Sequence, residues 1–434
     1  MENYILNDLP DDMILADGVS GSYDLSSTGR NGNLLIVGST GAGKTMSIIE
    51  PQILHTENDS IVVSLAKSEK VDGYAAYLRS KGYVTEVMDL VHPEKSTCNY
   101  DPMQYLFTSQ DIIDFANSMV KADATKQGDR DPYWDNAASL LIAAEISGLL
   151  EKWKIAKDMG RPCKYPTMND VLDFHDSLDF YETAGSGFTN SNKDRFFSSL
   201  VETNKDSYAY RCWRAVKGLA SKTVSCIAST VNTVFAQTFP KEIRQFMTTD
   251  SVFRFEVLGE LKTALFIVTS PVSKASQLYA NLIYSAIFKS LFDQAMLNEG
   301  VLDVPVHVLC DDFACGSRIP NFASYLSVMR SSGISATILL QSFSQLKSLY
   351  GEADMVTIMD NCDQMVYLGC NDLDTCNQIA RRMNVPLDVV LNLPIGEAIV
   401  FRRGFPYAKA KRYQTLRDVE YLKMCTLREL MRKD

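Results

Sequence analysis

An apolar run that breaks into glycines constrains this chain more than any other stretch. Residues 34–45 read LLIVGSTGAGKT and meet the pattern G-x-x-x-x-G-K-[ST], between a buried strand and the helix-compatible segment MSIIEPQIL. The glycines let the backbone turn with its N–H groups inward, where they and the helix N-terminus can hold phosphate oxygens. We therefore predict that a nucleoside triphosphate is bound by Gly38, Ser39, Thr40, Gly41, Ala42, Gly43, Lys44 and Thr45.

The last two side chains of this loop have separate expected roles. Lys44 is expected to reach the β and γ phosphates, and Thr45 is expected to be a ligand of Mg²⁺. The alternative is a glycine-rich turn that binds nothing. The order of strand, loop and helix argues against that alternative, because the pattern has this function only in that context.

Composition narrows the class of protein further. The chain has 434 residues, of which 46% are hydrophobic and 22% charged, and this length suggests two or three structural units. Ten cysteines without a C-x-x-C pair and four histidines indicate neither a zinc cluster nor a disulfide framework. The apolar segment at 137–150 is too short to span a bilayer, so we expect a cytoplasmic chain without a transmembrane segment. A net charge of −10 restricts any DNA contact to a local basic surface.

The order of apolar segments predicts an α/β fold with a mainly parallel sheet. Strands are expected at 34–37, 60–67, 83–90, 261–269, 306–314, 335–343 and 364–370, before two short strands that resemble an antiparallel edge hairpin. Residues 1–33 are expected to form a loose lead-in. Helical patterns dominate 103–254, so we predict an all-α insertion there and a nucleotide-binding domain made of 1–102 and 255–434.

Polar residues follow two of the later strands. Ligands of doubly wound sheets bind at the carboxyl ends of strands, so we expect these residues near the phosphates. Asp311 would hold the Mg²⁺ shell, Asp312 would orient or deprotonate the attacking water, and Gln341 would sense the γ-phosphate. The ordinary alternatives are a polar turn for the two aspartates and a helix-capping amide for the glutamine.

An arginine from a neighbouring subunit can stabilise the transition state of phosphoryl transfer. The candidates are Arg330, Arg381 and Arg382, and of these we favour Arg330. Each of them can equally be an ordinary surface residue.

Two basic segments are candidates for nucleic-acid contact. Residues 193–222 interleave cations with aromatic side chains, which suits phosphate contact and base stacking. The alternative is a solvated helical face whose aromatic side chains belong to the core. The second segment contains Arg402, Arg403, Lys409, Lys411 and Arg412, and it can equally be a plain solvated hairpin.

With these pieces placed, the chain resembles the VirD4/TraG-type coupling proteins, the ATPases that deliver DNA or protein substrates to type IV secretion and conjugation machines. The likeness runs through NGNLLIVGSTGAGKT, YWDNAASLL, LKTALFIVTSP, the segment from VHVLCDDF to SQLKSLYG, and NCDQMVYLGCNDLDTCNQIARRMN. It implies a RecA-like nucleotide domain carrying the all-α insertion, with ATP and Mg²⁺ as cofactors. It also implies hexamers like those of FtsK/HerA-type motors, and a helical domain that recognises a relaxosome or an effector protein.

Three departures from the family pattern are visible. Leu65-Ala66-Lys67 stands in place of an acidic-Pro-Lys motif, and Asp312 is one methylene shorter than the usual glutamate, which could slow hydrolysis. As the third departure, we expect no counterpart in this chain of the N-terminal transmembrane helices of the family, so it would dock at the inner face of the cell membrane through a partner of the secretion system or act as a soluble variant.

The sequence therefore predicts a P-loop ATPase, acting as an ATP-dependent coupling protein or DNA-translocating motor. Two alternatives stay open: a nucleotide-regulated recruitment platform with little or no hydrolysis, and a chromosome or plasmid motor unrelated to secretion. We expect a hexamer in the active state, and a monomer in isolation is compatible with that expectation.

Overall fold

The computed structural model describes residues 13–23, 28–66, 68–122, 132–177, 191–248, 251–311, 313 and 318–431. The chain divides into two compact units. The sheet unit consists of Met1–Thr97, Arg254–Ser273 and Ile287–Asp434, and the helical unit of Cys98–Phe253 and Lys274–Ala286. The domain boundaries that the sequence predicted, at 1–102, 103–254 and 255–434, stay predictions. The role of the inserted domain also stays a prediction.

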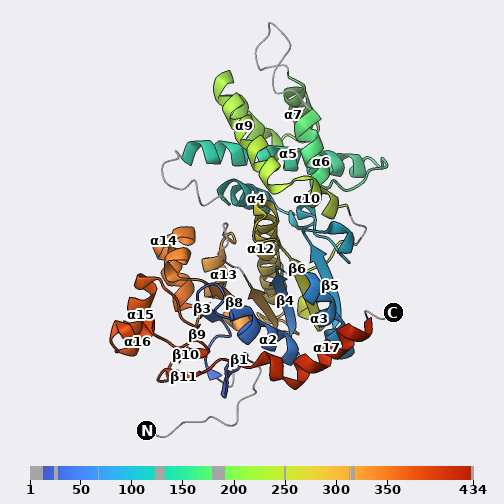
Figure 1. Ribbon diagram of the computed structural model, residues 1–434. Coiled ribbons are helices and arrows are strands. Elements are labelled where there is room, and N and C mark those ends of the chain that lie inside the picture. Colours follow the sequence, from blue (N-terminus) through green and yellow to red (C-terminus); the bar gives the residue numbers. More distant parts are fainter. Residues whose placement is uncertain are drawn as a thin grey trace. The chain divides into compact units, whose positions relative to one another are not determined.

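Nine strands among the described residues form one sheet in the order β11-β10-β9-β3-β8-β7-β4-β6-β5 (Figure 1). β3 (Leu34–Val37) lies between β8 (Ile334–Leu340) and β9 (Gln364–Tyr367) and is parallel to both. The remaining parallel strands are β4 (Ser60–Leu65), β5 (Val84–Asp89), β6 (Thr263–Val268) and β7 (Val306–Cys310). β10 (Glu397–Arg402) and β11 (Ala408–Lys411) form the predicted antiparallel edge hairpin. The mainly parallel sheet is thus confirmed.

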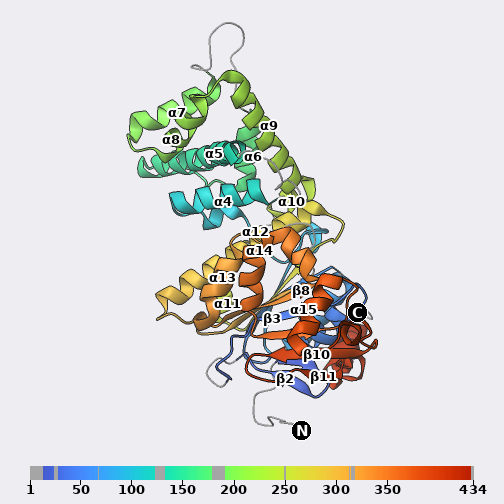
Figure 2. The ribbon, with the colours of Figure 1, turned by 90° about the vertical axis from the view of Figure 1, so that its left-hand side faces the viewer.

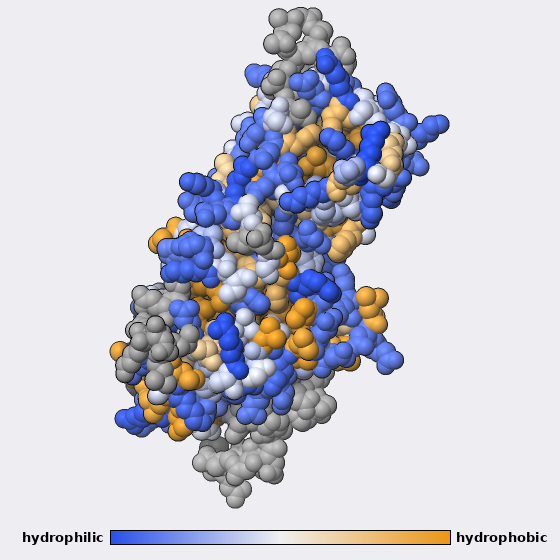
Figure 3. Space-filling view, turned by 90° about the vertical axis from the view of Figure 1, so that its right-hand side faces the viewer, coloured by the Kyte–Doolittle hydropathy of each residue, from blue (hydrophilic) through white to orange (hydrophobic). Residues whose placement is uncertain are grey.

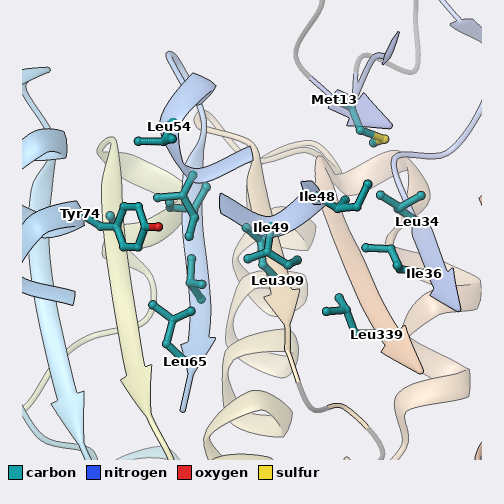
Figure 4. Close-up of a cluster of buried hydrophobic side chains, with 14 of the residues drawn as sticks. Met13, Leu34, Ile36, Ile48, Ile49, Leu54, Leu65, Tyr74, Leu309 and Leu339 are labelled. Atoms are coloured by element: carbon teal, nitrogen blue, oxygen red, sulfur yellow. The ribbon is translucent and has the colours of Figure 1, made fainter. Parts of the chain in front are cut away.

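Both faces of the central strands are buried. Leu34 and Ile36 point into a hydrophobic cluster that contains Ile49 and Tyr74 from the helices on that face (Figure 4). Side chains alternate across a strand, so Leu35 and Val37 face the other way, and they are fully buried too. Burial on both sides explains why β3 is a continuous apolar run without polar alternation.

The helices of the sheet unit follow its strands in the alternating order expected of an α/β fold. They are α2 (Glu50–His55), α3 (Ser68–Ser80), α11 (Val257–Glu260), α13 (Phe322–Val328), α14 (Phe343–Asp360), α15 (Leu373–Met383), α16 (Leu387–Leu391), α17 (Val419–Met431) and the second half of α12 (Lys274–Leu297).

A small hairpin precedes the sheet, where the sequence analysis expected a loose lead-in. β1 (Met13–Ala16) pairs with β2 (Val19–Gly21), so that expectation is wrong for these residues. Met13 and Leu15 are fully buried in the hydrophobic cluster. The strand is short and has only two alternating buried side chains on this face. An alternation of that length is too short to stand out in the sequence among the polar residues around it.

The helical unit is organised around α5 (Pro132–Asp158), which contacts five other helices (Figure 2). Residues 141–148 in its middle are all buried, whichever way their side chains point, which is typical of a helix enclosed by protein. The surrounding helices are α4 (Ser109–Lys121), α6 (Met168–Ser177), α7 (Asn192–Thr203), α8 (Tyr208–Lys217) and α9 (Ser221–Thr238), and the short α10 (Lys241–Phe246) follows them.

Among the described residues, no helix combines the length and apolar character that a membrane span requires. On the face drawn in Figure 3, exposed hydrophobic side chains lie in small groups among hydrophilic ones.

A charged cluster is enclosed among these helices. The Glu145 carboxylate on α5 accepts a hydrogen bond from the Lys193 ammonium on α7 and lies 2.9 Å from Nδ1 of His175 on α6. Nε2 of His175 lies 2.8 Å from Oδ1 of Asn232 on α9. Glu145 and Lys193 are fully buried, and the lysine holds the pKa of the Glu145 carboxyl below its usual value despite the burial. Four helices are therefore joined by one polar network, of which Glu145, His175 and Lys193 are buried.

We expect Lys193→Ala to lower the free energy of unfolding by about 3–5 kcal/mol, because it leaves the buried charge of Glu145 without its partner. Urea denaturation followed by circular dichroism measures the loss. Lys205→Ala, at an exposed position of the same unit, is the control and should change the value by less than about 0.5 kcal/mol. Equal stability of the two variants would contradict a structural role for this pair.

Candidate nucleotide-binding site

The predicted phosphate-binding loop follows the carboxyl end of β3 and is fixed to both neighbouring strands. The Gly38 N–H donates to the carbonyl oxygen of Leu340 at the end of β8, 3.0 Å away. The Ser39 N–H donates to the carbonyl oxygen of Gly369, beyond the end of β9, 2.9 Å away. The first half of the loop therefore has its position set by the sheet.

The three glycines of the loop are required for two different reasons. A Cβ atom on Gly38 would lie 3.0 Å from Cβ of Leu368 and 3.1 Å from Cβ of Ala42, so a larger residue would push these neighbours apart. Gly41 and Gly43 have φ values of +77° and +81°, in the left-handed region that glycine adopts without steric cost. The glycine pattern thus reflects close packing at its first position and backbone conformation at the other two.

Lys44 folds back over the loop that precedes it. Its ammonium group donates to the carbonyl oxygens of Gly38 and Ser39, at 2.5 and 3.2 Å. These contacts hold a positive charge beside the loop, and the loop's N–H groups and this charge are suited to phosphate oxygens.

The helix after the loop begins with a wide turn. Thr45–Ile49 has π-helical hydrogen bonding, in which the Glu50 N–H donates to the Thr45 carbonyl, and α2 continues from Glu50. Pro51 has no N–H and cannot donate to the carbonyl four residues earlier. A wide turn at this place is one way for the chain to pass through the proline without ending the helix.

Thr45 and Asp311 meet although 266 positions separate them. The Thr45 hydroxyl donates to Oδ2 of Asp311 at 2.8 Å. Asp311 follows β7, and its backbone carbonyl accepts a hydrogen bond from the Ser64 hydroxyl of β4 at 2.9 Å. A hydroxyl and a carboxylate are hard oxygen ligands, and Mg²⁺ in nucleotide sites is usually held by one or two such groups together with phosphates and waters. Asp312, the expected catalytic acid, lies outside the described residues.

Gln341 lies at the same edge of the sheet. It follows β8, which is between β3 and β7, so the residue lies between the strand of the loop and the strand of Asp311. Its side chain is exposed, and its N–H donates to Oε1 of Gln345 at 3.0 Å. The N-cap of α14 is Ser342 rather than Gln341.

Arg330 is placed differently from the other candidates. It precedes β8 and is thus at the opposite end of that strand from Gln341. Its guanidinium is exposed and donates to the carbonyl oxygen of Gly29 at 2.9 Å. The structure therefore does not bring Arg330 to the loop of its own chain. Of the other two arginines, Arg381 is exposed, and Arg382 lies over the ring of Phe401, 4.5 Å from its centroid.

Arg412 contacts the phosphate-binding loop, a contact that was not predicted from the sequence. Its guanidinium donates to the carbonyl oxygens of Ala42, of Leu368 at 2.7 Å and of Glu397 at 3.2 Å. Burial lowers the pKa of the Arg412 guanidinium, which stays protonated at neutral pH. Contacts with distant carbonyl groups leave no pattern in a sequence, so only its place in a basic segment was visible.

Three of the other four cations of that C-terminal segment have partners within the protein. Arg403 lies 3.1 Å from Asp363, Lys409 lies 2.6 Å from Glu397, and Arg402 donates to the carbonyl of Ser20. These contacts favour the alternative of a structural hairpin.

Some of the residues proposed for nucleic-acid contact in the basic segment at 193–222 lie in the protein interior. Phe197 and Trp213 are fully buried and stack with ring centroids 5.1 Å apart, so base stacking by these two rings is excluded. Lys193 is buried against Glu145, and Lys217 pairs with Asp194. The exposed cations that remain are Arg195, Lys205, Arg211, Arg214 and Lys222.

Solved structures with a similar fold are known. The chain is similar to plasmid coupling protein TrwB in complex with ADP and Mg²⁺, with 17% identity, a TM-score of 0.65, and coverage of 95% of this chain and 92% of that chain. The same protein in complex with the ATP analogue ADPNP matches with 17% identity and a TM-score of 0.65 over 93% of this chain and 89% of that one. VirB4 of Thermoanaerobacter pseudethanolicus matches with 14% identity and a TM-score of 0.55, over 94% and 98%. The predicted RecA-like fold with an inserted helical part is thereby confirmed.

At the level of sequence, a search of curated proteins finds no match. A family model described as type IV secretory system conjugative DNA transfer matches residues 17–384. That range includes the phosphate-binding loop, Asp311 and Gln341, and it confirms the resemblance to coupling proteins. Because the match covers most of the chain, this protein belongs to the type IV secretory system conjugative DNA transfer family.

Proposed function

We propose that this chain is an ATP-dependent coupling motor that brings DNA, as a relaxosome, or an effector protein to a type IV secretion or conjugation system. The observation that carries the proposal is the hydrogen bond between Thr45 and Asp311, which joins the end of the phosphate-binding loop to an acidic residue beyond β7. Membership of the conjugative DNA transfer family and the nucleotide complexes of TrwB support it.

Each residue of the site has a role in this proposal. The loop N–H groups and Lys44 bind the phosphates of ATP, while Thr45 and Asp311 hold Mg²⁺. The metal supplies charge neutralisation at the transferring phosphoryl group. Gln341 contacts the γ-phosphate or orients the water, and Asp312 accepts a proton from that water as ATP is hydrolysed to ADP and phosphate.

The oligomeric part of the proposal concerns Arg330. Its exposed guanidinium is at the end of β8 remote from Gln341, so its proposed role in hydrolysis is at the nucleotide of another subunit. We infer a hexamer with nucleotides bound between subunits, and an inserted domain at 103–254 that recognises the substrate. The proposed site of action is the inner face of the membrane, reached through a membrane component of the secretion system.

Replacing Lys44 tests the proposed hydrolysis. We expect Lys44→Ala to lower ATP turnover by about 100-fold or more, because it removes the positive charge nearest the phosphates, while the thermal unfolding midpoint stays close to that of the wild type. Lys347→Ala, which alters an exposed ion pair with Glu352, is the matched control. Unchanged phosphate release by Lys44→Ala would refute the assignment.

The metal role of Asp311 has its own test. Asp311→Asn keeps the size of the side chain and removes its charge, so we expect the Mg²⁺ concentration that gives half-maximal ATPase activity to rise about tenfold. A Mg²⁺ titration at fixed ATP measures the change. An unaltered titration curve would remove Asp311 from the metal site.

DNA dependence separates a motor from a recruitment platform. For a DNA motor we expect single- or double-stranded DNA to raise the steady-state ATPase rate at least about threefold, with an effect that weakens as salt is added. Intact nucleotide binding without hydrolysis, with or without DNA, would instead favour the platform.

A further inference from the structure

The Arg412 guanidinium joins three segments that are far apart in the sequence. It donates to the carbonyl oxygens of Ala42 in the phosphate-binding loop, Leu368 after β9 and Glu397 at the start of β10. A guanidinium carries five N–H donors in a fixed planar fork, so one side chain can hold three acceptors at fixed angles. Arg412 follows β11, and the Gly396 carbonyl accepts a hydrogen bond from its N–H at 2.8 Å.

Holding the Ala42 carbonyl also sets the direction of the next N–H group. The peptide unit between Ala42 and Gly43 is planar and trans, so its C=O and its N–H point in opposite directions. With the carbonyl fixed on Arg412, the Gly43 N–H is directed away from that side chain. Gly43 has φ +81° and no side chain to restrict it, so an external contact is needed to select one orientation of this peptide.

The residues after β9 also hold the loop at Ser39. Leu368 accepts from Arg412, and the carbonyl of the adjacent Gly369 accepts from the Ser39 N–H at 2.9 Å. Ser39 is thus bonded directly to Gly369, and Ala42 is linked through Arg412 to the preceding residue, Leu368. Removal of the Arg412 side chain would take away the contact at the Ala42 carbonyl, whereas the Ser39 N–H has its own acceptor on Gly369.

The segment that carries Arg412 is itself fixed along the helix after the loop. The Thr415 hydroxyl donates to the Met46 carbonyl, and the Asp418 carboxylate lies 2.7 Å from Nε2 of His55. Residues 412–418 therefore contact the loop, the first turn of the following helix and its last residue. This support gives the guanidinium a fixed place from which to hold the loop.

We propose that Arg412 is a positioning residue for nucleotide binding, which directs the Gly43 N–H toward the phosphates by holding the Ala42 carbonyl from the outer side of the loop. The inference rests on the proposed function, since it assumes that the loop binds a nucleotide. The N–H groups of such a loop cradle the α and β phosphates, so Arg412 supports the binding of ADP and ATP alike.

Calorimetric titration of ADP and of the ATP analogue ADPNP, with Mg²⁺, tests this role in the full chain alongside steady-state ATPase kinetics. We expect Arg412→Ala to raise the Kd of both nucleotides by the same factor of about ten, as the loss of one directed hydrogen bond to phosphate implies. KM for ATP should rise by a similar factor, while kcat changes less than about threefold. Arg412→Lys keeps the positive charge but loses the planar set of N–H donors. This variant should still bind both nucleotides about threefold more weakly than the wild type.

Lys409→Ala on the same hairpin is the control and should leave both Kd values unchanged, because its ammonium pairs with the Glu397 side chain and not with the loop. Wild-type affinity for ADP in Arg412→Ala overturns the inference, as does a fall in kcat with ADP binding kept, since that result would place the guanidinium on the γ-phosphate. If Arg412→Ala does not fold, the same criteria apply to Arg412→Lys. Failure of the wild type to bind either nucleotide overturns the proposed function itself.

Discussion

Parallel pairing of β3 with β8 and β9 is the constraint on which the site depends. In a parallel sheet all carboxyl ends lie along one edge, so the loop after β3, Gln341 after β8 and Asp311 after β7 are brought to the same edge by topology alone. The hydrogen bonds from Gly38 and Ser39 to the two neighbouring strands then fix the loop in register with those ends. Little further structure is needed to place the Thr45 hydroxyl against the Asp311 carboxylate.

Much of this arrangement could be predicted because its signals are local. Strands buried on both faces are uninterrupted apolar runs, and the phosphate-binding loop combines glycine spacing with a following helix. The pairing of Thr45 with Asp311 followed from the rule on carboxyl ends. Arg412 could not be found in this way, because its partners are backbone carbonyls of three segments and carbonyls are present at every position.

The basic segment of the helical unit shows the opposite limitation. Lys193 and Trp213 are residue types that suit nucleic-acid contact, but the structure uses them in the core. The partner that allows Lys193 to be buried is Glu145, 48 positions earlier on another helix. Residue type and spacing describe one helix at a time and do not show which face meets which neighbour. Which cations of this segment are exposed and which is buried is therefore decided by the packing of the helices against one another.

The point at which the helical part leaves the chain has a consequence for how such proteins can diversify. β5 and β6 are adjacent parallel partners, and Cys98–Phe253, the first of the two segments of the helical unit, lies between them in the sequence. The two ends of this segment are closed on each other, because the Asn99 N–H donates to the Ser251 carbonyl at 2.7 Å and the Asn99 carbonyl accepts from the Phe253 N–H at 2.9 Å. A segment whose ends are already joined can gain, lose or exchange helices without moving the strands on either side. Selection can therefore alter the helices between these two ends while the edge of the sheet that carries the phosphate-binding loop is inherited unchanged.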